Sequence, residues 1–304
     1  GSSSAARGVD VDLGDDAAVL TPHAGRAVLS VDAAVEGVHF RRDFLELETI
    51  AQRAMSAAIS DLAAMGARPR AALCAFNLPA TFSDAELDRL VLGFAQAAER
   101  YGCPVVGGNL TRGTELSLTT TVVGEASDRV LTRAGARPGD RIYVTGEVGA
   151  AALGLQLLLS GRGASGPRFV ARYAEPSARV AEGLVLREHA TAAIDVSDGL
   201  LQDLEHLCEA SGVCAEIESS ALPLVDGHAE LGLALGLDPI ALALTGGDDY
   251  ELLYTLPADA AQEPLGTPIG VITQDPGRGP RCTVRGEDGE LRRFARAGYR
   301  HFAE

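Results

Sequence analysis

The sequence predicts an α/β protein with mixed sheets, organised as two domains that cover residues 1–134 and 135–304. Three observations support this prediction. The chain has 304 residues, which is long for one domain and natural for two. Hydrophobic residues make up 46% of the chain, enough to fill two cores. Strand-like and helix-like segments alternate in both halves, and the turn-forming stretch Gly135-Ala136-Arg137-Pro138-Gly139-Asp140 separates the halves.

The first half is predicted to contain two helices and four strands. Residues 49–65 have apolar side chains at helical spacing, and Gly66 ends that helix. A second helix begins after Ser83, where Glu86 completes a capping box. Apolar and β-branched content predicts strands at 27–31, 71–78, 104–106 and 116–124.

The second half repeats this mixture. Helices are expected at 149–160, at 200–210, around Ile240 and, as a long element, after Pro176. Strands are expected at 141–145, 192–196, 215–217, 250–256, 269–273 and 282–284, the last forming a hairpin over 287–290.

Charge and composition limit the function. The 26 basic and 42 acidic residues give a net charge of −16, which argues against nucleic acid as a partner. Every basic side chain other than His is Arg, so a lysine-containing phosphate loop is excluded. An acidic protein can still bind a nucleotide, because magnesium supplies the positive charge.

Cysteine use and hydropathy indicate the compartment. The five cysteines are odd in number and lack CxxC spacing, so they are interpreted as reduced, mostly buried thiols of a cytoplasmic protein. The longest apolar run, near 150–159, is too short to cross a bilayer, so no membrane contact is expected.

Seven acidic or acid-flanked clusters dominate the chain. Carboxylates at the ends of apolar segments are typical ligands of magnesium, and magnesium held this way usually accompanies a nucleoside triphosphate. Phosphoryl transfer is therefore the leading hypothesis. The clusters are Gly14-Asp15-Asp16, Ser30-Val31-Asp32, Ser60-Asp61, Gly107-Gly108-Asn109, Asp195-Val196-Ser197-Asp198-Gly199, Gly246-Gly247-Asp248-Asp249, and Glu36 near His39.

Each cluster in the first half also has a simpler structural explanation. Asp15 and Asp16 follow a glycine, as in a solvated turn. Asp32 is predicted to end a strand, where α/β folds place ligands, but turns use aspartate too. Asp61 lies in an otherwise apolar helix, where a half-buried carboxylate needs a cation or hydrogen-bond donors; a surface position is the alternative. His39 is also explained as a structural histidine.

The clusters of the second half carry more information. A buried strand leads directly into Asp195, Ser197 and Asp198 and then into a helix. The two carboxylates suit a metal, and the first N–H groups of the helix suit phosphate oxygens. A helix cap would explain Asp198 but not Asp195. Gly247 would let a ligand approach the backbone beside Asp248, although a plain loop is the alternative.

Other catalytic arrangements find little support. Arg133 is suited to clamp a phosphate, or it is a surface arginine. The sequence has no Ser-His-Asp order, no GxSxG elbow and no His/Cys array for zinc, which argues against acyl transfer and zinc chemistry.

Taken in order, these motifs resemble the thiamine-monophosphate kinase family, in the superfamily of aminoimidazole ribonucleotide synthetase and selenophosphate synthetase. The resemblance covers nearly the whole chain, and the combination of SDLAAMGA, AIDVSDGL and GGDDYEL is highly specific for the kinase. The matching segments are Gly14-Asp15-Asp16, SVDAAVEGVHF (30–40), ISDLAAMGA (59–67), GGNLTRG (107–113), LTRAGARPGDRIYVTG (131–146), AIDVSDGL (193–200), GGDDYEL (246–252) and GYRHF (298–302).

The resemblance implies magnesium-assisted, in-line phosphorylation of thiamine monophosphate by ATP, giving thiamine diphosphate. It also implies a two-domain aminoimidazole ribonucleotide synthetase-like fold and a homodimer whose N-terminal sheets pair. Asp61, Asp198 and Arg133 would be catalytic. The ligands of several magnesium ions would be Asp16 with its neighbour Asp15, Ser30, Asp32, Asp61, Asp195 and Asp198. The nucleotide site would include Tyr101, Gly108, Asn109, Arg133 and Ser197, and the substrate site His39, Asp248 and Tyr299.

Three positions depart from the family pattern. Val31 replaces a usual Thr, Asn109 a usual Asp, and Asp248 a usual Glu. Asn109 keeps a carbonyl oxygen and loses a charge, and Asp248 is one methylene shorter. These departures keep open a nucleotide-binding paralogue without catalysis. A related ATP-using synthetase acting on another small molecule is the other alternative.

Overall fold

The structure is a computed structural model that describes residues 8–13, 17–261, 263–275, 277, 281–292, 294 and 298. The chain divides into two units, Gly1–Leu62 with Ala67–Val130 and Ala63–Gly66 with Leu131–Glu304. Helices and mixed sheets occur in both units, which confirms the predicted fold class.

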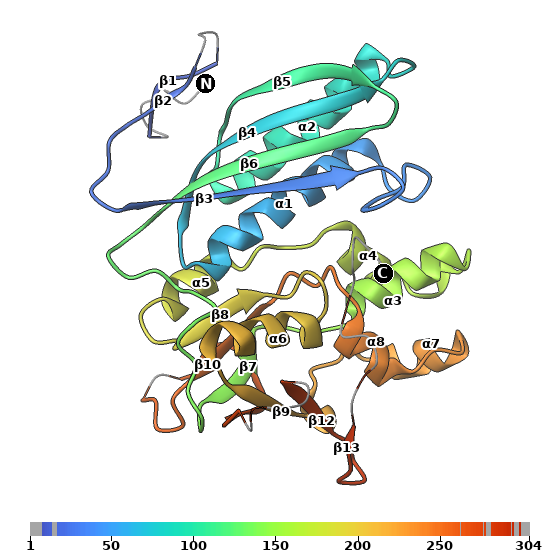
Figure 1. Cartoon of the computed structure of the whole chain (residues 1–304). Helices are drawn as coiled ribbons and strands as arrows, with labels where there is room; N and C mark the ends of the chain where they lie inside the picture. Colours follow the sequence, from blue (N-terminus) through green and yellow to red (C-terminus); the bar gives the residue numbers. More distant parts are fainter. Residues whose placement is uncertain are drawn as a thin grey trace. The chain divides into compact units, whose positions relative to one another are not determined.

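The first unit is a four-stranded sheet with helices α1 and α2 on one face (Figure 1). Its strand order is β3-β6-β4-β5, where β4 and β5 are parallel and the other neighbours are antiparallel. The elements are β1 (Val9–Val11), β2 (Val19–Leu20), β3 (Arg26–Val35), α1 (Leu47–Ala64), β4 (Arg68–Pro79), α2 (Asp84–Tyr101), β5 (Val105–Gly113) and β6 (Ser117–Ala126).

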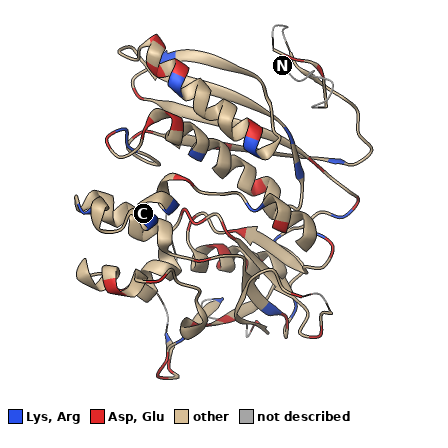
Figure 2. Ribbon diagram, turned by 180° about the vertical axis from the view of Figure 1, so that it is seen from behind, with Lys and Arg blue, Asp and Glu red and all other residues tan. Residues whose placement is uncertain are grey.

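Local sequence explains both helices. Ile50, Ala54, Ala58 and Leu62 recur every four residues in α1 and are buried. The predicted capping box of α2 is confirmed, because Ser83 accepts a hydrogen bond from the Glu86 amide and the Glu86 side chain accepts one from the Ser83 amide. Charged residues recur along both helices, as the colours of the ribbon seen from behind show (Figure 2).

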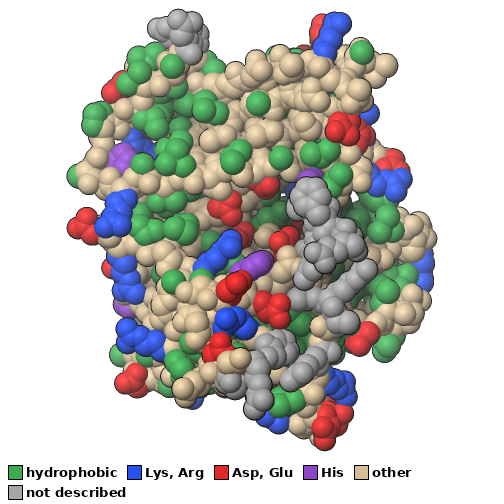
Figure 3. All heavy atoms as spheres, viewed as in Figure 1, with side chains coloured by type: hydrophobic (Ala, Val, Ile, Leu, Met, Phe, Trp, Pro, Cys, Tyr) green, Lys and Arg blue, Asp and Glu red, His purple; other side chains and the backbone are tan. Residues whose placement is uncertain are grey.

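One end of the opposite face of this sheet is covered by the hairpin β1–β2, where Val9 packs on Ala71 and Val106. The rest of that face, here called the uncovered face, carries exposed apolar side chains among the described residues. Leu29 and Val31 of β3 point to it and are 67% and 61% exposed. In the antiparallel ladder Val31 pairs with Thr121, which also pairs with Leu73 of β4. Figure 3 shows hydrophobic side chains scattered over this face. Leu29, Val31 and Leu73 therefore form an exposed apolar area on this face.

The second unit is built around a seven-stranded mixed sheet in the order β13-β12-β9-β11-β7-β10-β8. Its strands are β7 (Arg141–Val144), β8 (Ala192–Asp195), β9 (Cys214–Glu218), β10 (Leu252–Leu256), β11 (Thr267–Thr273), β12 (Cys282–Arg285) and β13 (Leu291–Arg292). Its helices are α3 (Ala150–Leu159), α4 (Pro167–Ala174), α5 (Val180–Leu186), α6 (Leu200–Ser211), α7 (His228–Ala234) and α8 (Pro239–Thr245).

Side chains of this sheet alternate between two cores. On β8, Ala192 and Ile194 belong to the core under α6 and α8, whereas Ala193 belongs to the core that includes Leu186 of α5. Strand β8 lies at the edge of the sheet and ends at Asp195. The sheet thus places Asp195 and the residues after it at an edge, beside the first turn of α6.

Three predictions about elements are wrong in detail. Strand β3 continues to Val35, so Asp32 lies inside the strand, not at its end. Strand β5 does not stop at the glycines but runs on to Gly113, because it pairs with β4 along this length. The long helix expected after Pro176 is the short α5.

The cysteine prediction is confirmed, since all five thiols are free and buried. None of the helices among the described residues combines the length and apolar character needed to cross a membrane.

Candidate functional site

In the first unit, the structure brings Ser30 and Asp61 into contact. The Ser30 hydroxyl donates a hydrogen bond to Oδ2 of Asp61, which α1 presents toward β3. Asp32 lies two residues along β3 from Ser30 and therefore on the same face of the strand. Val31 points to the opposite, uncovered face. The replacement of the family's usual Thr by Val at this position therefore removes no oxygen ligand from the group formed by Ser30, Asp32 and Asp61.

Gly108 and Asn109 lie on the uncovered side of the first unit. A Cβ on Gly108 would come within 1.9 Å of the Cys74 carbonyl oxygen, so glycine allows β5 to approach β4 here. Asn109 is exposed, and its side chain donates to Thr111 Oγ1 at 3.4 Å. Both residues line a pocket of about 680 Å³ on the sheet, together with Leu13, Leu20, Leu73, Val106, Thr121 and neighbouring small residues.

The hairpin β1–β2 borders this pocket through Leu13 and Leu20. Arg70 of β4 holds the hairpin by donating to the carbonyl oxygens of Gly8 and Thr21, at 3.3 and 3.1 Å. The guanidinium also pairs with Glu125 of β6. One arginine therefore fixes the base of the hairpin to the central strands.

His39 and Tyr101 have local partners in the first unit. His39 Nδ1 accepts a hydrogen bond from the Val35 amide at 3.1 Å, which orients the ring after β3. The Tyr101 hydroxyl lies 3.0 Å from Ser56 Oγ of α1, so Tyr101 also joins the two helices. The substrate role predicted for His39 and the nucleotide role predicted for Tyr101 stay predictions.

In the second unit, the segment 195–199 turns tightly around Asp203. A single carboxylate oxygen of Asp203, Oδ2, accepts the amides of Ser197, Asp198 and Gly199 at 3.0, 3.1 and 3.1 Å. The amides that precede α6 are therefore not available to phosphate, whereas the predicted contact of phosphate with the first N–H groups of the helix itself, from Leu200 onward, stays a prediction. The amides of residues 197–199 are used internally to shape the segment, and Asp195 and Ser197 flank the turn.

Sequence reasoning missed Asp203, which is only 3% exposed. Burial, followed by repulsion from Asp195 and Asp198, raises the pKa of Asp203 to about 8. Its signal in the sequence is an acid in the first turn of α6, where a carboxylate can reach back to the preceding amides.

The two acidic motifs of the second unit are hydrogen-bonded to each other. The amides of Asp248 and Tyr250 donate to the carbonyls of Ser197 and Val196, at 2.9 and 2.8 Å. A Cβ on Gly247 would lie 2.3 Å from the Ser197 carbonyl oxygen, so this close approach requires glycine. The structure therefore brings Ser197, Asp198 and Asp248 together in neighbouring loops.

The backbone at Asp248 suits the residue found there. Asp248 has φ of 70°, in the left-handed region. Among residues with a Cβ, aspartate is one of the few that are enriched in this region. The replacement of the family's usual glutamate by aspartate is therefore compatible with the local conformation.

The remaining predicted site residues are less closely defined. Arg133 is exposed, and its carbonyl accepts the Ser211 hydroxyl at 2.9 Å. Asp15, Asp16 and Tyr299 lie outside the described residues. Gly298, which precedes Tyr299, is close to the 195–199 segment, because a Cβ there would lie 2.4 Å from the Asp198 carbonyl oxygen.

Asp249, on the far side of the same motif, should make stability depend on pH. Burial raises the pKa of Asp249 to about 7, although the amides of Gly149 and Ala151 oppose the shift. Between about pH 4 and pH 7 the folded protein therefore holds a proton that the unfolded chain has released. The contribution of Asp249 to the free energy of unfolding should fall across this window as pH rises, by at most about 1.4 kcal/mol per pH unit, and then level off.

Denaturant unfolding at several pH values, compared with Asp249→Asn, tests this expectation. The asparagine side chain of the variant does not titrate. The difference in the free energy of unfolding between the wild-type protein and the variant should therefore decrease as pH rises from 4 to 7. A difference that stays constant from pH 4 to 7 would show that Asp249 is ionised throughout.

The described donors fit magnesium by their chemistry, because they are carboxylate and hydroxyl oxygens. Across the parts of the chain that the structure describes, however, no three side chains of His, Cys, Asp or Glu are gathered as a metal-binding group. Asp15 and Asp16, the remaining predicted donors, fall outside those parts.

Comparisons with known proteins agree with this arrangement. Residues 14–126 match the AIR synthase related protein N-terminal domain, and residues 137–282 match the corresponding C-terminal domain. Thiamine-monophosphate kinase of Escherichia coli (strain K12) is 38% identical, with 97% of this chain and 93% of the relative covered.

Solved structures show the same relationship. Thiamine-monophosphate kinase from Stenotrophomonas maltophilia K279a superposes with a TM-score of 0.83 at 35% identity, covering 95% of each chain. AaThiL complexed with AMPPCP and TMP has a TM-score of 0.82 at 34% identity, covering 95% of this chain and 92% of the other. The chain thus belongs to the thiamine-monophosphate kinase family, among the AIR synthase related proteins.

Proposed function

We propose that this protein transfers the terminal phosphoryl group of ATP to the phosphate of thiamine monophosphate, giving thiamine diphosphate and ADP. The structural observation that carries the proposal is the hydrogen-bonded pair of acidic loops around Asp198 and Asp248. Family membership supports it, as does the binding of AMPPCP and TMP by a relative with the same fold.

The proposed reaction requires little proton transfer by protein side chains. A phosphate ester has its second pKa near 6, so the acceptor is already an oxyanion at neutral pH. A general base is therefore not needed. This agrees with the two acidic loops, which offer aspartates as metal ligands. The protein then has to hold two anionic phosphates in line and offset their repulsion.

Ser30, Asp32 and Asp61 in the first unit, and Asp195 and Asp198 in the second, would hold magnesium, with Asp15 and Asp16. Bound magnesium supplies positive charge that neutralises the phosphates and stabilises the transferring group. The Ser30 hydrogen bond orients the Asp61 carboxylate, and Asp203 fixes the turn that carries Asp198.

The binding roles follow the positions of the residues. Gly108 and Asn109 of β5 would contribute to the nucleotide site, as the family pattern implies. Arg133, Ser197 and Tyr101 would contribute to the nucleotide site. Asp248, His39 and Tyr299 would contact thiamine monophosphate, as the family pattern implies.

Two paired measurements test the function. A product assay with ATP, magnesium and thiamine monophosphate should yield thiamine diphosphate, and calorimetry should show magnesium-dependent ATP binding. Binding without product would favour the nucleotide-binding paralogue. Turnover of ATP with another small molecule, and none with thiamine monophosphate, would favour a related synthetase.

The uncovered face of the first unit supports a homodimer in which two such faces pair. Leu29, Val31 and Leu73 are exposed apolar side chains on one side of a regular sheet. Exposed apolar patches of this kind mark association surfaces. The free, buried cysteines are consistent with a reducing compartment, and we propose the cytoplasm.

Leu29→Glu should convert the dimer to a monomer. In a symmetric interface each substitution occurs twice, so two uncompensated carboxylates would be buried. Sedimentation velocity measures the change. Leu233→Glu is the matched control, because Leu233 of α7 is also 67% exposed but belongs to the second unit. A Leu29→Glu protein that still sediments as a dimer would rule out pairing through this face.

A further inference from the structure

The segment after Gly247 adopts an unusual backbone conformation. Asp248 and Tyr250 have φ of 70° and 51° and are the two non-glycine residues with positive φ among those described. A tyrosine is rarely found in this region, because its Cβ crowds the backbone. Surrounding contacts must therefore hold the segment in place.

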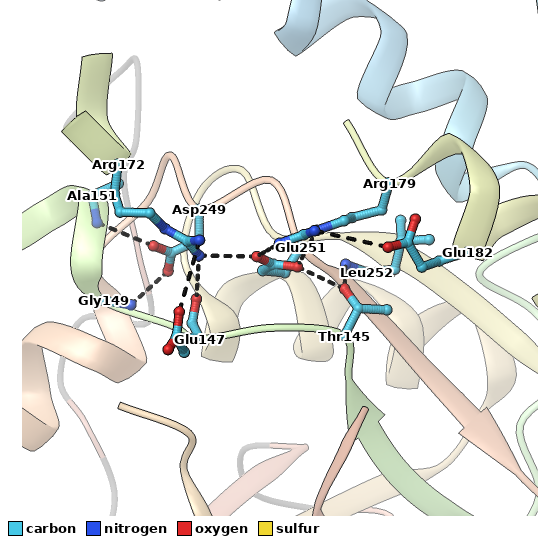
Figure 4. A network of polar contacts seen from close by, with 10 residues as sticks. All are labelled: Thr145, Glu147, Gly149, Ala151, Arg172, Arg179, Glu182, Asp249, Glu251 and Leu252. Carbon is cyan, nitrogen blue, oxygen red and sulfur yellow. Dashed lines mark hydrogen bonds and ion pairs between the residues drawn. The ribbon is translucent and has the colours of Figure 1, made fainter. Parts of the chain in front are cut away.

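Those contacts are made by the alternate residues, Asp249 and Glu251, which are buried (Figure 4). Asp249 accepts the amides of Gly149 and Ala151 at the start of α3, at 2.6 and 3.3 Å. His228 secures the other side of Gly149, with Nε2 3.2 Å from its carbonyl oxygen.

Glu251 is the centre of a larger network and is only 1% exposed. Its carboxylate takes two hydrogen bonds from Arg179, one of them at 2.6 Å from Nε. It also accepts from Arg172 Nη2 at 3.0 Å and from the Thr145 hydroxyl at 2.7 Å. Arg172 lies in α4, Arg179 directly precedes α5 and Thr145 directly follows β7, so three segments hold one carboxylate (Figure 4). The Glu251 carboxylate fits here because residue 146 is glycine; a Cβ on Gly146 would lie 2.3 Å from Glu251 Oε1.

The anchored residues determine where their neighbours lie. With Asp249 and Glu251 buried, the half-buried Asp248 and Tyr250 are left on the side of the 195–199 segment. The Tyr250 hydroxyl donates to Asp248 Oδ1 at 3.3 Å, which restricts the orientation of this carboxylate. The position of Asp248 therefore depends on the ion pair behind it.

We propose that Glu251, held by Arg179, is a positioning residue that keeps the 248–250 segment in its left-handed conformation and so directs Asp248 toward the acceptor substrate. This inference rests on the proposed function, in which Asp248 contacts thiamine monophosphate. Glu251 itself does not touch the substrate. A purely structural role would affect both substrates alike.

Glu251→Gln separates the two roles. It keeps the shape of the side chain and removes the charge that pairs with Arg179. We expect the KM and the calorimetric Kd for thiamine monophosphate to rise at least about tenfold, with the KM for ATP changing less than about twofold. An unchanged KM for thiamine monophosphate, or an equal rise for both substrates, would overturn the proposal.

Glu216→Gln is the matched control. Glu216 also receives two hydrogen bonds from one arginine, Arg285, elsewhere in the second unit, and it should leave both KM values unchanged. If the wild-type protein forms no thiamine diphosphate, the proposed function fails; if it does and Glu251→Gln behaves like Glu216→Gln, only the positioning role fails.

A milder pair of variants decides the question if Glu251→Gln does not fold. Thr145→Val removes one donor to Glu251, whereas Thr145→Ser keeps the hydroxyl. Thr145→Val should raise the KM for thiamine monophosphate in the same selective way, by a smaller factor, and Thr145→Ser should restore it. Equal KM values in the two variants would contradict the proposal.

Discussion

Asp198→Asn is expected to lower the turnover of thiamine diphosphate formation by more than about tenfold, a loss of at least about 1.4 kcal/mol of transition-state stabilisation. The substitution keeps the size of the side chain and removes a negative charge that would hold magnesium. The hydrogen bond from Gln202 Nε2 to Asp198 Oδ2, at 3.0 Å, involves one oxygen and leaves the other available. Asp61→Asn should give a comparable loss, because it removes the charge of another predicted magnesium ligand, whose Oδ2 accepts the Ser30 hydroxyl.

Turnover at saturating ATP, thiamine monophosphate and magnesium is the appropriate measurement for both variants. Asp259→Asn, at an exposed position outside both acidic motifs, is the control and should retain wild-type turnover. Wild-type turnover in Asp198→Asn and Asp61→Asn at saturating magnesium would remove these residues from the metal site.

Asp203→Ala is expected to destabilise the protein by about 3 kcal/mol or more and to abolish most activity. It leaves three amides, one of them buried and two partly buried, without their common acceptor, and an unsatisfied buried donor costs about 1–3 kcal/mol. The turn that carries Ser197 and Asp198 would then lose its defined shape. Denaturant unfolding and the product assay measure the two effects.

Asp238→Ala is a matched control for this prediction. Asp238 also accepts two backbone amides at the start of a helix, but at an exposed position. It should cost about 1 kcal/mol of stability and leave activity unchanged. If Asp203→Ala resembles Asp238→Ala in both measurements, the amides at 197–199 do not depend on Asp203.

Much of the first unit could be predicted from the sequence, because its signals are local. The capping box at Ser83 and the apolar spacing of α1 specify the two helices without reference to the rest of the chain. Strand β5 could not be bounded in this way. Gly107 and Gly108 look like a strand end in one dimension, but in the sheet they allow close pairing with Cys74 of β4.

The candidate site was predictable where acids follow apolar segments, as at Asp195 and Asp198. The buried residues that hold these acidic loops in place could not be predicted. Glu251 and Arg179 are 72 positions apart, and nothing near either residue indicates the pair. The role of Asp249 depends on the start of α3, a hundred residues earlier in the chain. Such contacts come from the tertiary fold, which periodicity and motif spacing do not report.

The anomalous signal of manganese in crystals grown with an ATP analogue and thiamine monophosphate tests the central claim most directly. Manganese replaces magnesium on oxygen ligands and can be located independently of the protein atoms. We expect manganese within about 2.0–2.2 Å of carboxylate oxygens of Asp61 and Asp198, the distances typical of such ions. Manganese bound only to other surface acids, with Asp61 and Asp198 free of metal, would contradict the assignment of these aspartates as the ligands that support phosphoryl transfer.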